Sequence, residues 1–134
     1  MSKNRILYLT EKDFVSMLVT EEEMTKIYSV RSEINNIAKN HFLNIKEYHK
    51  LVRKKLLLKN KIPIYFSQSL LLFYINSNKT IFWINYYMIL KICYDKNIVI
   101  FFKDGSMLEL EISKRVISNE LKKIYIVLEH INNL

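Results

Sequence analysis

The chain has 134 residues, a length typical of one domain, and we expect residues 1–134 to form a single domain. Half of the residues are hydrophobic and 13% are aromatic, which argues against intrinsic disorder. No apolar run is long enough to predict a membrane span, and the first residues lack the pattern of a signal peptide. A single cysteine, Cys93, excludes an internal disulfide and indicates a reducing, cytoplasmic location.

The amino-terminal third predicts a strand followed by helices. Residues 6–9 are apolar and indicate a short strand, whereas residues 11–30 fit a helix or a strand equally well. Residues 31–42 have apolar side chains at helical spacing, with Ser32 as a possible N-cap and Phe42 as the last member of the stripe. Residues 44–58 predict a second helix, in which lysines and an arginine face away from Ile45, Tyr48, Leu51 and Val52.

From Pro63 onward the sequence pattern changes to that of β-structure. Proline cannot donate a hydrogen bond to a sheet, so it fits the first residue of a strand. Residues 62–66, 70–75, 80–94, 98–102 and 107–112 are strand-like, and asparagine and aspartate mark turns where glycine is usual. The pair Asp104-Gly105 predicts a tight hairpin turn, because glycine tolerates a positive φ.

The last segment predicts one amphipathic helix that begins after Ser113, a suitable cap. Its apolar stripe consists of Ile117, Leu121, Ile124, Leu128 and Ile131. We expect this stripe to pack on the sheet, and a short coiled coil for dimerisation is the weaker alternative. The predicted fold class is therefore α+β, with an amino-terminal strand and helical segment, a central, mostly antiparallel sheet (about 63–112) and a carboxy-terminal helix (about 114–131).

The sequence contains no pattern that indicates catalysis. One glycine excludes a glycine-rich phosphate loop, and the histidines (His41, His49 and His130) do not have the spacing of a metal site. We therefore expect no catalytic residue, no metal, no cofactor and no enzymatic activity.

Positive charge is concentrated between residues 46 and 61. This segment has seven basic side chains and one acidic one, whereas residues 1–45 are neutral and residues 62–134 have two excess positive charges. The basic residues are Lys46, Lys50, Arg53, Lys54, Lys55, Lys59 and Lys61. A concentrated basic patch favours a polyanionic partner, and a solvated helix face is the alternative.

Three segments in a fixed order resemble the ComK family of competence transcription factors. They are KIPIYF (61–66), IFWINYYMILKI (81–92) and IVIFFKDGSMLELEIS (98–113), and the resemblance extends over about residues 34–132. The positions that match the family pattern, and that we expect to have structural roles, are Pro63, Trp83, Asn85, Gly105 and Ser113.

This resemblance implies a nucleoid-associated transcriptional activator of DNA-uptake genes that binds AT-rich duplex DNA as a homo-oligomer, largely through the minor groove. The seven basic residues of the 46–61 segment would then contact phosphates, and Arg53 would enter the groove, because guanidinium is weakly hydrated. The target DNA sequence and the size of the oligomer do not follow from the sequence.

Two departures from the family limit this interpretation. Residues 40–43 lack the Ser-Cys pair and glycine of the family, and the chain lacks the tail that a Clp-protease adaptor binds, so we do not expect that adaptor as a partner. A LytTR-type DNA-binding domain is an alternative, since its late strands have a similar turn. The other alternative is a protein-interaction module that modulates another regulator through Tyr86, Tyr87 or Tyr94.

Overall fold

The structure, a computed structural model, describes residues 4–58 and 60–132. It confirms the α+β class, with antiparallel sheets and a carboxy-terminal helix that packs on them. In the part of the chain that the structure describes, none of the helices combines the length and the apolar character needed to cross a membrane.

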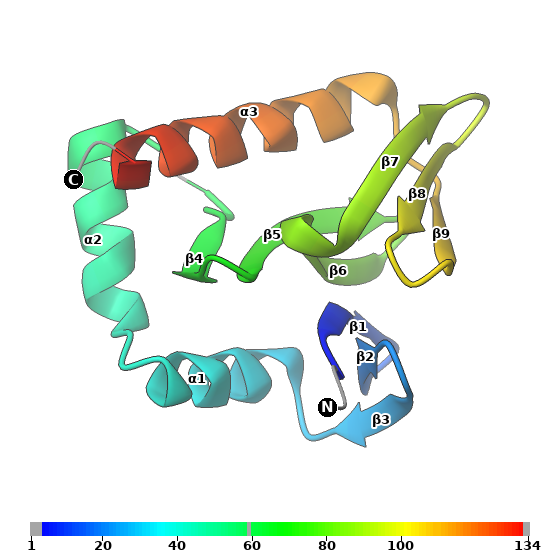
Figure 1. Cartoon of the computed structure of the whole chain (residues 1–134), viewed down its shortest axis with the longest axis horizontal. Coiled ribbons are helices and arrows are strands. Elements are labelled where there is room, and N and C mark those ends of the chain that lie inside the picture. The colour runs from blue at the N-terminus through cyan, green and yellow to red at the C-terminus, as the bar shows by residue number, and fades with distance from the viewer. Residues whose placement is uncertain (1–3, 59, 133–134) are drawn as a thin grey trace.

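Nine strands, three helices and one short 3₁₀ turn follow one another in the described residues (Figure 1). In chain order they are β1 (Ile6–Lys12), β2 (Val15–Thr20), β3 (Met24–Ile27), α1 (Val30–Asn40), α2 (Ile45–Leu56), β4 (Ile64–Ser67), β5 (Leu70–Ser77), β6 (Thr80–Asn85), η1 (Tyr86–Met88), β7 (Ile89–Tyr94), β8 (Ile98–Phe102), β9 (Met107–Leu110) and α3 (Lys114–Asn132).

The strands form a six-stranded sheet in the order β3-β2-β1-β6-β5-β4 and a three-stranded sheet in the order β7-β8-β9. The segment 11–30, which the sequence left undecided, contains the whole of β2 and β3, and both strands belong to the large sheet. β1 pairs with β6 in the middle of that sheet, with Tyr8 opposite Ile84 and Leu9 opposite Trp83. The amino-terminal strands are thus half of the main sheet.

Tight turns connect the hairpins, and most of them lack glycine. Asp13-Phe14 and Asn78-Lys79 each form a two-residue turn with both residues at positive φ, the geometry that matches the twist of paired strands. The predicted hairpin between β8 and β9 is confirmed, with Gly105 at φ +95°.

The two faces of the large sheet have different surroundings. One face, which we call the closed face, includes Leu71, Phe73, Ile75, Phe82 and Ile84, and these buried residues pack in one cluster with the small sheet and α3. Figure 1 shows α3 along one side of the strands and α1 along the opposite side. The predicted packing of α3 on the sheet is confirmed, because Ile117 and Ile124 belong to this cluster.

The opposite face, which we call the groove face, is only partly covered. Its members on β5 and β6 are Leu70, Leu72, Tyr74, Ile81 and Trp83. Helix α1 contributes Ile34, Ile37 and Ala38 to the buried cluster that also contains Leu70 and Leu72. Tyr74, Ile81 and Trp83 are only partly buried, so this face extends beyond the cover that α1 provides.

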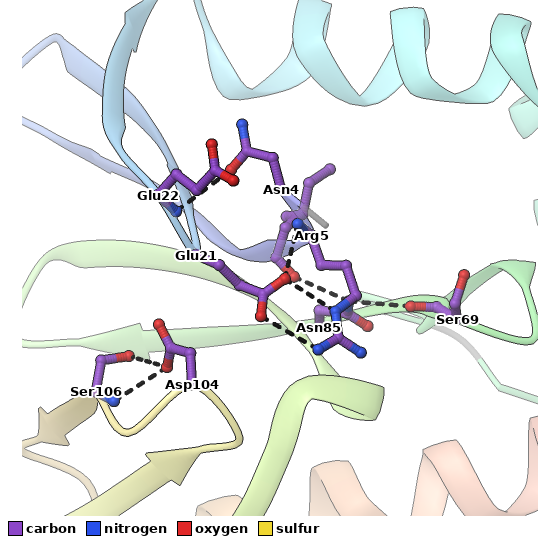
Figure 2. A network of polar contacts seen from close by, with 9 residues as sticks. Asn4, Arg5, Glu21, Glu22, Ser69, Asn85, Asp104 and Ser106 are labelled. Carbon is purple, nitrogen blue, oxygen red and sulfur yellow. Dashed lines mark hydrogen bonds and ion pairs between the residues drawn. The ribbon is translucent and has the colours of Figure 1, made fainter. Parts of the chain in front are cut away.

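The apolar run 80–94, read from the sequence as one strand-like stretch, is divided between the two sheets. Asn85 lies at the division: its side chain is buried, its amide donates to Ile6 O at 2.9 Å and Ser69 O at 3.1 Å, and its oxygen accepts from Leu71 N and Tyr87 N. Figure 2 shows Asn85 beside Ser69. These four hydrogen bonds satisfy the buried amide and fix the point where the chain leaves β6.

Two further polar contacts fasten the ends of the hairpins (Figure 2). The Arg5 guanidinium binds both carboxylate oxygens of Glu21, at 2.9 and 3.2 Å, which links the segment before β1 to the segment after β2. In the β8–β9 turn, the Asp104 carboxylate accepts hydrogen bonds from the backbone and the hydroxyl of Ser106.

Two predicted helix features are wrong in detail. The N-cap of α1 is Ser29, whose hydroxyl oxygen accepts from Ser32 N at 3.0 Å, so the predicted cap Ser32 lies within the helix. Phe42 follows the end of α1 in a left-handed conformation and is 99% exposed, because the helix ends at Asn40 and Phe42 therefore does not join the apolar stripe. At α3 the Ser113 hydroxyl accepts from Val116 N, as predicted.

Candidate nucleic-acid interface

Helix α2 carries most of the concentrated positive charge, and its ends are arranged as helix electrostatics favour. Asn44 caps it by accepting from Glu47 N at 3.0 Å, and Glu47 places a negative charge in the first turn. Arg53, Lys54 and Lys55 lie in the last turn, where positive charge is favourable. The helix therefore tolerates a high density of cations without a compensating acid beside each one.

Tyr48 connects this helix to the start of β4. Its hydroxyl donates to Pro63 O at 2.6 Å and accepts from Tyr65 N at 3.3 Å. Burial raises the pKa of Tyr48 to about 12, and the hydrogen bond from Tyr65 opposes that rise. The basic segment and the only proline of the chain are thus joined physically, because one phenol on α2 bonds to both sides of the strand entrance.

Four basic side chains share the outer surface of α2, which we call the basic face: Lys46, Lys50, Arg53 and Lys54. All four are exposed and, with Glu47 and His49, line a shallow hollow along the helix. In residues 4–58 and 60–132 the ion pairs are Arg5–Glu21 and Lys123–Glu120, so none of the four is neutralised by an ion pair there. Burial, followed by the charge of Arg53, lowers the pKa of His49.

Of the other three predicted phosphate contacts, the two that the structure describes do not join this surface. Lys55 is exposed but does not line the hollow, because it lies about 140° around the helix from Lys50. Lys61 lies beyond α2, and its ammonium is 4.7 Å from the centre of the Tyr74 ring. Lys59 lies outside the described residues. Leu51, expected on the apolar side of α2, is also exposed, so Val52 is the buried residue of this helix.

The five positions that match the ComK pattern lie away from the basic face. Pro63 is buried at the entrance to β4, Gly105 and Ser113 border β9 and α3, and Asn85 ends β6. Trp83 lies on the groove face, opposite Tyr74 on β5. These positions belong to turns, caps and strand ends of the fold.

A groove of about 660 Å³ lies between the groove face, α1 and the start of α2. Trp83, Tyr74 and Ile81 belong to its sheet side, and Ile34 and Ile45 to its helices; its charged and ionisable lining residues are Glu11, Arg31, Lys46, His49 and Lys61. Sequence reasoning missed this site, because its residues come from six separate helices and strands and no local motif unites them. The signal that could have found it is a tryptophan paired with a tyrosine on a face that the helices leave partly uncovered.

No group of three or more histidine, cysteine or acidic side chains suited to a metal ion occurs among the residues that the structure describes. The lysine and arginine side chains of the basic face are positively charged, so they attract phosphates and repel metal ions. The chemistry available on α2 is therefore electrostatic binding of a polyanion.

Comparisons with known proteins add little to what this geometry indicates about function. No family model matches the chain, and no curated protein matches it. Among solved structures, it is similar to the "LytTr DNA-binding domain of putative methyl-accepting/DNA response regulator from Bacillus cereus", with 17% identity over 90% of this chain and 81% of that chain and a TM-score of 0.45. A TM-score this low does not establish a shared fold, so the function has to be inferred from the surface chemistry of this chain.

Proposed function

We propose that this protein is a non-catalytic domain that binds duplex DNA through the basic face of α2. The observation that carries the proposal is the set of four exposed cations, Lys46, Lys50, Arg53 and Lys54, on one side of a helix at the outer edge of the molecule (Figure 1). Such a face attracts the phosphate backbone, and neutralising phosphates releases condensed counterions.

Arg53 supports the finer part of the proposal, a preference for AT-rich sites. Narrow A-tract minor grooves have an enhanced negative potential, and a planar, weakly hydrated guanidinium enters them more readily than an ammonium does. Arg53 is exposed near the end of α2, flanked by Lys50 and Lys54 on the same face. We propose that these lysines position the helix on phosphates while Arg53 enters the groove.

Regulation of transcription is the biological role that such binding suits. Control of DNA-uptake genes is an expectation from the ComK resemblance and stays a prediction, as do homo-oligomerisation on the DNA and association with the nucleoid. A LytTR-like regulator would share the partner, duplex DNA.

The test is fluorescence anisotropy of labelled duplexes, one rich in A-tracts and one rich in GC, from about 50 to about 300 mM salt. If the four cations of the basic face each neutralise one phosphate, log K should fall against log salt with a slope of about −3 to −4. The double variant Lys50→Ala/Arg53→Ala should weaken binding to both duplexes and reduce that slope by about 2.

The matched control is Lys96→Ala/Arg115→Ala. It also removes one lysine and one arginine, both exposed, in the turn after β7 and at the start of α3, at the opposite end of the molecule from α2 (Figure 1). We expect the control to bind as the natural chain does. Equal weakening of the two variants would contradict a defined interface, and equal affinity for the two duplexes would contradict AT preference.

A second candidate function, a protein-interaction module, is favoured by an apolar surface on the other side of the molecule. Leu90 is 65% exposed and Tyr125 is 69% exposed, and the hollows that they line both include Leu121. Of the tyrosines expected to serve this role, Tyr94 is exposed, whereas Tyr86 and Tyr87 are half-buried. A pull-down that recovers a protein partner through Leu90 and Tyr125, while DNA binding is absent, would favour this function.

A further inference from the structure

Trp83 occupies a position where a large aromatic side chain is not fully used by the fold. It is only partly buried and lines the groove, whereas its strand neighbours Phe82 and Ile84 are buried on the closed face. Its ring and that of Tyr74 meet edge to face, with centroids 5.5 Å apart. Two aromatic rings fixed on adjacent strands form a rigid platform that needs no rearrangement to receive a planar group.

The groove around this platform has the size and composition of a small-ligand site. Its volume of about 660 Å³ falls within the range of about 300–1,000 Å³ typical of such sites. Ile34, Ile45 and Ile64 contribute apolar surface. A flat, partly apolar group can therefore lose much of its hydration on the aromatic platform.

Positive charge predominates at this groove. Arg31, Lys46 and Lys61 line it, and Glu11 is its acidic residue. The Glu11 carboxylate already accepts hydrogen bonds from the Ser16 hydroxyl and, at 3.5 Å, from Val30 N. One oxygen of this carboxylate is thus engaged by neighbouring donors, and three cations against one acidic side chain leave the groove an excess of positive charge for an anionic ligand.

Lys61 places its ammonium group over the Tyr74 ring of the platform. It has φ +49°, a region that residues other than glycine seldom adopt, and its ammonium lies 4.7 Å from the centre of the Tyr74 ring. A lysine over one ring of an aromatic pair suits a ligand that has both a planar aromatic group and a phosphate. A nucleotide has these two groups a short distance apart.

We propose that this groove binds an unpaired nucleotide of a nucleic-acid strand, with the base on Trp83 and the phosphates among Arg31, Lys46 and Lys61. Base stacking on aromatic side chains combined with a basic groove is the general means of binding single strands. A strand is favoured over a free nucleotide because the groove continues into the basic face: Lys46 and His49 line both this groove and the hollow on α2. The phosphates of the neighbouring nucleotides can therefore bind to the cations of the basic face. The site does not depend on duplex binding by α2.

The first measurement is quenching of Trp83 fluorescence, which reports on this groove alone because the chain has one tryptophan. The probes are a short oligothymidylate, its duplex with oligodeoxyadenylate, and thymidine monophosphate. We expect saturable quenching by the single strand, weaker binding of the monophosphate and little quenching by the duplex. Absence of quenching by the single strand at low salt would overturn the proposal, and so would equal quenching by the duplex.

Affinity for the monophosphate equal to that for the oligonucleotide would overturn the assignment to a strand. The variant Arg31→Gln/Lys61→Asn removes two cations from the groove, and asparagine tolerates the positive φ of residue 61. The control Arg115→Gln/Lys79→Asn removes the same residue types outside the groove, and Lys79 also has a positive φ. We expect about tenfold weaker single-strand binding for the groove variant and no change for the control.

A second variant, Trp83→Leu, removes the π-face and keeps an apolar side chain on the strand. Measured by anisotropy with a labelled oligonucleotide, it should bind about fivefold or more weakly than the natural chain. Unchanged affinity of either groove variant would overturn the proposal. The Lys50→Ala/Arg53→Ala variant separates the two sites: it should lose duplex affinity and keep the quenching by the single strand, because neither residue lines the groove. Quenching by the single strand in a natural chain that does not bind the duplex would retain this inference and discard the proposed function.

Discussion

The two faces of the six-stranded sheet differ in how completely the rest of the chain covers them. On the closed face, Phe73 and Ile84 are fully buried among the small sheet and α3. On the groove face, α1 covers one part of the strands, while Trp83 and Tyr74 stay partly exposed beside cations. Alternate residues of β5 and β6 therefore lie in two different environments, one fully buried and one partly exposed.

Because of this difference, we expect the closed face to contribute mainly to stability and the groove face mainly to binding. A closed face contributes through apolar burial and close packing, and it offers no surface to a ligand. A partly open face contributes less to stability and leaves aromatic and charged groups available. Substitutions at adjacent positions of β5 and β6 should therefore differ in their consequences, with stability lost on one face and binding lost on the other.

The largest effect is expected on the closed face. Phe73→Ala should lower the free energy of unfolding by about 3–5 kcal/mol, since it leaves a cavity beneath the small sheet. Its neighbour Tyr74 faces the groove and is partly exposed, so Tyr74→Ala should cost less, about 1–2 kcal/mol. Urea unfolding of the two variants measures the difference, and equal losses would contradict the distinction between the faces.

An intermediate effect is expected where α2 meets the sheet. Tyr48→Phe removes the hydrogen bond to Pro63 O and leaves Tyr65 N without its partner, which should cost about 1–3 kcal/mol. Because folding raises the Tyr48 pKa from 10.0 to about 12, the neutral phenol contributes stability that is fully present below about pH 10 and is lost as the pH rises through about 12.

The natural chain should therefore lose up to about 2–3 kcal/mol more stability than Tyr48→Phe between these pH values. Parallel urea titrations of the two proteins check this, since the other tyrosines titrate alike in both. A loss of the same size in both proteins would show that the Tyr48 hydroxyl is not held as described.

The smallest effect is expected at the turn that joins β5 and β6, the two strands that contribute to both the closed face and the groove face. Lys79 has φ +68°, so Lys79→Gly relieves a strained conformation and should raise the free energy of unfolding by about 0.5–1 kcal/mol. Lys79→Ala, which keeps the strain, should leave stability nearly unchanged. Thermal unfolding of the two variants measures the effect, and stabilisation by alanine would contradict the strain.

The sequence predicts the elements whose pattern is local. The stripe from Ile117 to Ile131, the Asp104-Gly105 turn and the strand after Pro63 each depend on a few neighbouring residues, and all three are present. Residues 11–30 could not be assigned, because a three-glutamate run obscures the alternation of β2 and β3. The cap at Ser29 was missed since Ser32 offers the same side chain three residues later.

Long-range pairing and the site are beyond such patterns. Nothing local indicates that β1 pairs with β6, or that Asn85 satisfies carbonyls of Ile6 and Ser69 and thereby ends one sheet. The basic face follows from helical periodicity, so Lys50, Arg53 and Lys54 could be placed together in advance. The position of Lys61 could not, because its left-handed backbone and its contact with the Tyr74 ring follow from no local pattern.

The pairing of β1 with β6 also bears on how the protein is made. During synthesis, β1, β2 and β3 leave the ribosome long before Ile84 does, so the inner edge of β1 has no partner while α1, α2, β4 and β5 are translated. An unpaired strand edge is a template for wrong association. Slow translation before residue 85 should therefore prolong the period in which the nascent chain depends on chaperones.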